Sequence, residues 1–292
     1  MTYAEYIKKL NELKRKSENA IVASAPSIEK MAYQIAVDFI DENLDTKDGK
    51  LVANENALRA LNKFADDYLG AFTENAKYKG AVSGYLKNFK AIADIMDEFQ
   101  KSQGVRDIKQ ARLGAVQEIV TNEILNRYSA NGLNAGFVQP LRELLYNNIT
   151  SGLNKKDAMA QLKDYIQSGK DTSGKLHRYL EQTAQQGVDS YTGAVNVRIM
   201  ETFKIETYIM SGSLIATSSN QCRYAIEKLG GIIDRKDWPK LKALAEKDGL
   251  IEGTTFDNLP INKLHWGCRH EFTPVKLSEK QRENLLKNPV NN

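Results

Sequence analysis

Cysteine, histidine and proline are scarce in this chain. Its 292 residues include two cysteines, three histidines and six prolines. Two cysteines are too few for the disulfide framework of a small secreted domain. No run of about 18 apolar residues occurs, so we expect neither a transmembrane helix nor a membrane partner. The first residues also lack the basic and then apolar pattern of a secretory signal. We therefore expect a soluble protein that is made in a cytoplasm.

The chain has little excess of charge of either sign. The 41 basic and 37 acidic residues give a net charge of +4, which is too small to indicate a nucleic-acid-binding protein by itself. One basic run lies near the start of the chain and consists of Lys8, Lys9, Lys14, Arg15 and Lys16. Such side chains can reach DNA phosphates, although Glu5 and Glu12 lie among them. The pattern is also typical of the solvated face of an amphipathic helix.

Proline is unevenly distributed along the chain. Only Pro26 and Pro140 lie in the first 238 residues, and the other four prolines lie in the last 54. Because proline interrupts helices, the long stretches without it favour long helices. Apolar residues recur at helical steps of three and four within 58–72, 86–99, 113–124 and 176–203. Helices are also expected from about 138 to 151 and from Asn154 onwards.

Two features of this helical region call for no ligand. The apolar stripe over 176–203 is typical of packing, and His177 beside it is expected to be a surface residue without a special role. The segment 45–50 predicts a turn between helices. It is not a calcium loop, because Leu44 occupies the position of the first ligand.

The character of the sequence changes near Ile205. Segments 206–210 and 214–217 are short and favour strands, and the second half of 264–275 predicts another strand. Helices are expected from about 222 to 229 and after Asp237. We therefore predict a mainly α fold with a long helical region, a small α+β domain and a tail. Their expected bounds are 1–205, 206–277 and 278–292.

The small domain contains the one cluster of residues with metal chemistry. Four of the five cysteines and histidines of the chain fall in it, namely Cys222, His265, Cys268 and His270. Cys222 lies in the first turn of its predicted helix, where backbone amides favour a thiolate. Two sulfurs and two imidazole nitrogens are the donor set of a closed tetrahedral structural zinc site. We therefore expect these side chains to converge and to bind Zn²⁺.

Other interpretations of the same residues stay open. Cys222 can be a free buried thiol or form a disulfide with Cys268, and the histidines can make ordinary hydrogen bonds. A Cys–His nucleophile or a metal-dependent nuclease is weaker, because no further base and no glycine-rich phosphate loop accompany the cluster. We therefore expect no catalytic residues.

The same domain resembles the phage Mu F-like minor head proteins, also called head morphogenesis proteins. The resemblance covers about 75 residues. Three stretches are responsible for it, namely 216–223 with Cys222-Arg223, Leu229-Gly230-Gly231, and 265–270 followed by Pro274. His270 stands where the family usually has cysteine, and histidine can bind zinc but cannot form a disulfide.

This resemblance implies a non-catalytic capsid component in the phage head. It would associate with the portal or with the head interior during assembly and DNA packaging, after synthesis in the bacterial host cytoplasm. Portal protein, other virion proteins and packaged DNA are then the expected partners, the DNA through Lys8, Lys9, Lys14, Arg15 and Lys16. The alternatives are a DNA-binding module and a zinc-dependent nuclease or other hydrolase.

Overall fold

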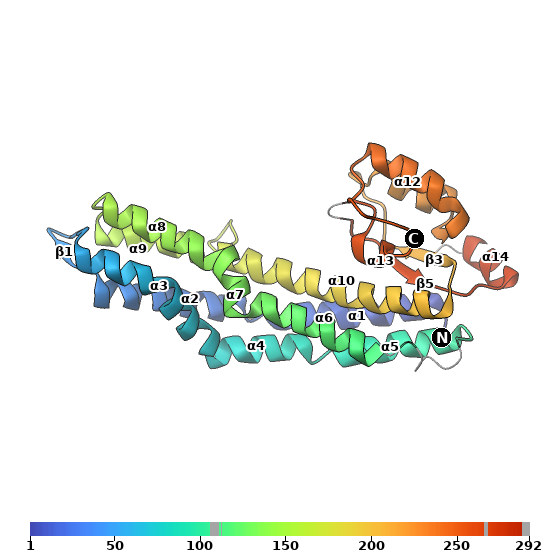
Figure 1. Ribbon diagram of the computed structural model, residues 1–292, viewed down its shortest axis with the longest axis horizontal. Coiled ribbons are helices and arrows are strands. Elements are labelled where there is room, and N and C mark those ends of the chain that lie inside the picture. Colours follow the sequence, from blue (N-terminus) through green and yellow to red (C-terminus); the bar gives the residue numbers. More distant parts are fainter. Residues whose placement is uncertain (106–110, 112, 266–267, 288–292) are drawn as a thin grey trace. The chain divides into compact units, whose positions relative to one another are not determined.

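The computed structural model describes residues 1–105, 111, 113–265 and 268–287 (Figure 1). It is 71% helical, with long helices in the N-terminal part and a few strands near the C-terminus, which confirms the predicted fold class. The α-helices within the described part of the first 203 residues are α1 Tyr3–Val22, α2 Ala25–Asn43, α3 Glu55–Glu74, α4 Ala76–Leu86, α5 Phe89–Ser102, α6 Leu113–Tyr128, α7 Ala130–Leu133, α8 Gln139–Thr150, α9 Lys155–Ile166 and α10 Lys175–Phe203. A π-helical turn, η2 Asn134–Val138, joins α7 to α8. Pro26 and Pro140 lie in the first turns of α2 and α8, where proline removes no helical hydrogen bond.

The chain forms two compact units. The bundle unit comprises 15–88 and 122–187, and the sheet unit comprises 1–14, 89–121 and 188–292. Three of the borders between the units fall inside α1, α6 and α10, and the fourth falls between α4 and α5. Residues 206–277 belong to the same unit as 1–14, because side chains from the helices bind the strands directly. The predicted tail contains α14, Glu279–Lys287, and residues 288–292 lie outside the described part.

Buried aromatic side chains form the core of the bundle unit, where α2 packs on α3 and α9. Phe39 and Phe64 meet edge to face at 4.7 Å, and the Tyr68 hydroxyl donates to the Ala32 carbonyl at 2.9 Å. The predicted turn near 45–50 is a small hairpin of β1, Thr46–Lys47, and β2, Lys50–Leu51.

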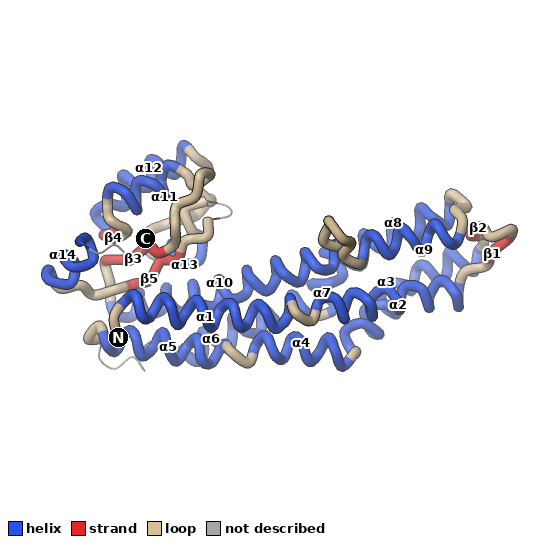
Figure 2. Tube along the Cα trace, turned by 180° about the vertical axis from the view of Figure 1, so that it is seen from behind, coloured by secondary structure: helices blue, strands red, loops and turns tan. Residues whose placement is uncertain are grey.

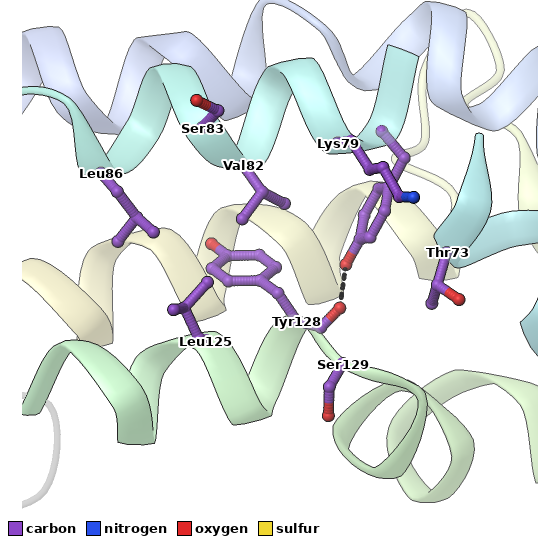
Figure 3. Close-up of a pocket in the computed structure, with 9 residues that line it drawn as sticks. Thr73, Lys79, Val82, Ser83, Leu86, Leu125, Tyr128 and Ser129 are labelled. Carbon is purple, nitrogen blue, oxygen red and sulfur yellow. Dashed lines mark hydrogen bonds between the residues drawn. The ribbon is translucent and has the colours of Figure 1, made fainter. Parts of the chain in front are cut away.

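The bundle unit also has a largely apolar cavity of about 530 Å³ between α4 and the end of α6 (Figure 3). Val82 and Leu86 of α4 and Leu125 and Tyr128 of α6 are among the side chains that line it. The Tyr78 hydroxyl donates to the Tyr128 carbonyl at 2.7 Å and joins the two helices.

His177 differs from its prediction, because it is half-buried and has a charged neighbour. Its Nδ1 atom lies 3.2 Å from Oε1 of buried Glu29, a contact distance without the alignment of a hydrogen bond. Glu29 also accepts hydrogen bonds from the backbone and the hydroxyl of Ser168, at 3.0 and 2.9 Å. These contacts fix the segment between α9 and α10, which is a structural role that the sequence did not reveal.

The sheet unit contains a three-stranded antiparallel sheet in the order β4-β3-β5 (Figure 2). The strands are β3 Thr207–Ser211, β4 Ile232–Asp234 and β5 Glu271–Pro274. The prediction of a strand at 214–217 is wrong. The strand β3 ends at Ser211, the chain turns at Gly212 with a φ of 126°, and 214–217 form a loop. The strand β4 was not predicted.

Short helices surround this sheet. They are α11 Asn220–Arg223, the π-helical turn η3 Tyr224–Lys228, the 3-10 turn η4 Arg235–Asp237, α12 Trp238–Lys247 and α13 Leu259–Asn262, besides α14. The helix predicted over 222–229 is therefore present as α11 followed by η3. The helix predicted after Asp237 is α12, with Pro239 in its first turn.

Candidate metal centre

The four side chains singled out by the sequence lie together in the sheet unit. Cys222 is buried in α11, and His265, Cys268 and His270 come from the segment between α13 and β5. The sulfurs of Cys222 and Cys268 and a ring nitrogen of His270 lie within 4.8 Å of one another. His265 Nε2 is 3.3 Å from Cys222 Sγ. Trp266 and Gly267, which belong to the same motif, lie outside the described residues.

The spacing of the donor atoms fits tetrahedral coordination. With metal–sulfur and metal–nitrogen bonds of about 2.3 and 2.0–2.1 Å, the sulfur-to-nitrogen edge of a tetrahedron is about 3.5 Å. The Cys222–His265 edge of 3.3 Å and the Cys268–His270 edge of 3.6 Å are close to this value. Within the described residues, Cys222, Cys268 and His270 are the one group of three or more metal-binding side chains placed to hold a metal ion, and His265 lies outside that group. With His265 as a fourth donor, the ion would have no open coordination position.

The two cysteines are free thiols, and their electrostatics favour one thiolate. The hydrogen bond between the sulfurs lowers the pKa of Cys268, because that sulfur is the acceptor, and the hydrogen bonds from His265 and His270 act in the same direction. The same sulfur-to-sulfur hydrogen bond raises the pKa of Cys222, as does burial. The pair therefore shares one proton, which a metal ion would displace.

Gly212 allows the imidazole of His270 to lie against the end of β3. A Cβ atom added at this glycine would lie 2.9 Å from Cδ2 of His270, and the φ of 126° disfavours any other residue. The His270 ring presents Nδ1 to Cys268, while its Nε2 atom is buried without a hydrogen-bond partner among the described residues. The sequence analysis missed Gly212, although a glycine between the two predicted strands at 206–210 and 214–217 was a usable signal.

Arg223 positions the loop that precedes Cys222. Its guanidinium donates to the carbonyls of Ile215, Ala216 and Ser218 at 3.0 to 3.2 Å. These hydrogen bonds replace the strand pairing that we predicted for 214–217. Because Arg223 directly follows Cys222, they also fix the start of α11. In the sequence, Arg223 stood out only as part of the Cys-Arg motif. The structure shows its physical role, which is to fix the loop before Cys222.

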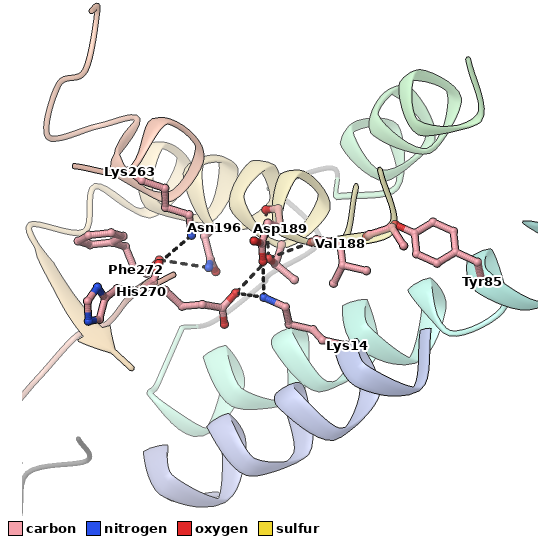
Figure 4. A network of polar contacts seen from close by, with 11 residues as sticks. Lys14, Tyr85, Val188, Asp189, Asn196, Lys263, His270 and Phe272 are labelled. Carbon is pink, nitrogen blue, oxygen red and sulfur yellow. Dashed lines mark hydrogen bonds and ion pairs between the residues drawn. The ribbon is translucent and has the colours of Figure 1, made fainter. Parts of the chain in front are cut away.

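A buried cluster of charges lies next to the candidate ligands (Figure 4). Lys14 Nζ lies 2.6 Å from Asp189 Oδ1 and 2.6 Å from Glu271 Oε1, and we call these residues the Lys14 triad. Burial lowers the pKa of Lys14, but the two carboxylates outweigh it and raise that pKa. Burial alone would raise the pKa of Glu271, but the charge of Lys14 outweighs burial, so this pKa lies below its ordinary value. Lys14 is therefore not a surface contact for DNA, which corrects that part of the prediction.

Comparisons with family models, with curated proteins and with solved structures find no match for this chain. None of the helices within the described residues has both the length and the hydropathy that crossing a membrane requires.

Proposed function

We propose that this chain is a non-catalytic minor head protein of a phage, with a structural Zn²⁺ ion bound by Cys222, His265, Cys268 and His270. The observation that supports the metal most directly is the convergence of two thiols and the His270 imidazole within 4.8 Å, with the His265 imidazole 3.3 Å from the sulfur of Cys222. This donor set is typical of structural zinc sites, whereas catalytic zinc keeps one position for water. A closed site of this kind would stabilise the sheet unit and would not turn over a substrate.

The role in the virion rests on the resemblance to Mu F-like proteins. The Cys222-Arg223 pair, the glycines at 230–231 and the His–Cys–His run occur in the family's order. Two of these sequence features have a physical role in the proposed centre. Arg223 fixes the loop before Cys222, and the segment 265–270 supplies the other three proposed ligands. A helical protein without catalytic groups acts by binding, and the portal and other virion proteins are the partners that we propose.

Packaged DNA is a further proposed partner. Lys8, Lys9, Arg15 and Lys16 are exposed on α1, in contrast to Lys14. Exposed lysine and arginine side chains bind phosphates by releasing counterions, without reading the base sequence. The four side chains would contribute affinity for the nucleic acid inside a head.

The metal is tested by measuring the zinc content of the full-length chain purified without chelators. We expect about one zinc ion per chain, since four protein donors complete one tetrahedral ion. Cys222→Ser should lower this content sharply. A wild-type chain that binds no zinc, even after refolding with Zn²⁺, would contradict the proposed centre.

The role in the virion needs a separate experiment. We expect the full chain to copurify with phage heads in cells that assemble them, and the chain lacking 206–292 to be absent from the heads. Finding the protein outside virions, with metal-dependent cleavage of plasmid DNA, would instead support a nuclease.

A further inference from the structure

We propose that metal occupancy controls the docking of the N-terminal segment, residues 1–14, on strand β5. The inference rests on the proposed metal centre and concerns its regulation. The strand β5 begins at Glu271, the residue directly after the candidate ligand His270. The first part of α1 binds this same strand through side chains. The metal ligands and the docking site therefore share one short piece of backbone.

The strongest of these contacts is the Lys14 triad. The side chains of Lys14 and Glu271 are only 11% and 10% exposed, and their charged atoms are 2.6 Å apart. A buried ammonium group is stable only while its carboxylate partners stay in place. Docking of residues 1–14 therefore requires Glu271 to keep its position. A shift of β5 would separate this carboxylate from Lys14 and leave two buried charges poorly compensated.

The strand β5 depends on side chains because it is an edge strand. It pairs with β3 along one edge, and no described strand pairs with its other edge. There the carbonyl of Phe272 accepts a hydrogen bond from the Asn196 side chain at 3.2 Å, and the carbonyl of Pro274 accepts one from Gln100 at 2.9 Å. The Tyr3 hydroxyl adds a long contact of 3.4 Å to Thr273. Four residues of strand pairing give little stability by themselves, so the N-terminal end of β5 depends on what fixes His270.

Two groups fix the chain at His270. Lys263 donates to the His270 carbonyl at 2.9 Å, and the side chain points into the candidate metal centre. A bound ion would join His270 and Cys268 to Cys222 in α11 and would fix the start of β5. Removal of the ion leaves this end with the Lys263 hydrogen bond and the pairing of Glu271 with Ser211 at the end of β3, and we expect β5 to fray from there. Residues 1–14 would then lose Glu271, one of the two carboxylate partners of Lys14, and expose the side chains of Tyr6 and Leu10, which are fully buried in the docked state.

The test uses the full chain, once loaded with Zn²⁺ and once stripped with a chelator, with metal content measured in each sample. Amide hydrogen exchange is followed in residues 3–14, in β5 and in α3 of the bundle unit as an internal reference. We expect stripping to accelerate exchange in 3–14 and in β5 by about tenfold or more, and to leave α3 unchanged. Lys14→Met should accelerate exchange in 3–14 even with zinc bound. Lys9→Met, at an exposed site on the same helix, should not.

The outcomes separate the two proposals. If zinc binds and exchange in 3–14 does not change on stripping, the coupling is wrong and the metal centre stands. The coupling is also wrong if Lys14→Met keeps full protection of 3–14 in the zinc-loaded chain. If the wild-type chain binds no zinc, the metal centre fails and the coupling fails with it.

Discussion

At the scale of single residues, Cys268 is the ligand whose replacement best tests the centre. Its sulfur is close to Cys222 and lies 3.6 Å from Nδ1 of His270. Cys268→Ser removes a thiolate that zinc prefers to a hydroxyl. We expect the loss of bound zinc and a lower unfolding free energy, by about 4 kcal/mol at free zinc near 1,000 times the Kd. Chemical denaturation with and without zinc measures this difference.

His177 provides the control for that experiment, because it is the one histidine outside the cluster. His177→Gln should keep the full zinc content. Equal zinc content in wild type and Cys268→Ser would show that this sulfur is not a ligand.

Gly187 is a second residue where a small change is expected to have a large effect. A Cβ atom there would clash with the Tyr85 hydroxyl and lie 3.2 Å from Cγ2 of Ile124, all within the bundle unit. The Tyr85 hydroxyl donates to the Ala184 carbonyl at 2.8 Å, so the ring cannot move freely. We expect Gly187→Ala to lower the unfolding free energy by about 1–3 kcal/mol, because overpacking forces side chains from their rotamers. Thermal unfolding measures it.

The matched control is Gly70→Ala in α3. A Cβ atom at Gly70 meets no described atom within 4 Å, and the residue lies inside a helix. Alanine should therefore raise the unfolding free energy by about 0.5–1 kcal/mol through the lower entropy of the unfolded chain. If both variants change stability in the same direction, the packing argument at Gly187 is wrong.

At the scale of elements, α14 is docked by few contacts. It has no buried residues, and Arg282 donates to Asp234 Oδ1 at 2.7 Å. A helix of nine residues is unstable alone in water. We expect Arg282→Met to speed amide exchange in 279–287 by about tenfold, since hydrogen bonds to charged groups contribute about 1.5–3 kcal/mol. Lys280→Met, at an exposed site on the same helix, should leave the exchange unchanged.

The same ion pair predicts a pH dependence for α14. Burial raises the pKa of Asp234, but the hydrogen bonds from Arg282 and Thr207 outweigh it, so this pKa lies below its ordinary value. The contribution of Asp234 to docking is therefore complete above the ordinary pKa of about 3.9 and is lost as the pH falls through the lower folded value. Exchange in 279–287 measured down this range should show the release. Release of α14 on raising the pH from neutral would contradict this assignment.

At the scale of the whole molecule, the exposed basic side chains of α1 make DNA binding a measurable property. Replacing all four by glutamine should make the slope of log K against log salt less negative, by up to about 3.6, or 0.9 per lost phosphate contact. The replaced residues are Lys8, Lys9, Arg15 and Lys16. Fluorescence anisotropy with duplex DNA at several salt concentrations gives this slope.

A matched variant with the same change of charge separates a local contact from net charge. It carries glutamine at four exposed lysines of the bundle unit, Lys63, Lys77, Lys87 and Lys156. Its salt slope should stay close to that of the wild type. Equal slopes for all three proteins would show that α1 makes no phosphate contacts.

The sequence by itself determined the helical character and the members of the candidate metal centre. Helical periodicity and the position of proline are local properties, so they are visible in a few turns of sequence. The four candidate ligands were visible because cysteine and histidine are scarce and concentrated in one segment. The loop at 214–217 was predicted wrongly because its β-leaning residues are common in loops as well. The contact that decides its shape is a guanidinium several positions later.

Only the tertiary structure decided the division into compact units, the role of Lys14 and the partner of His177. Lys14, Asp189 and Glu271 are far apart in the chain, and no local pattern distinguishes a lysine on the solvated face of a helix from one that meets a buried and a half-buried carboxylate. Burial of such a charge depends on which strand packs against the helix. That choice is made by the summed packing of distant segments, because a single turn of helix contributes too little to fix it.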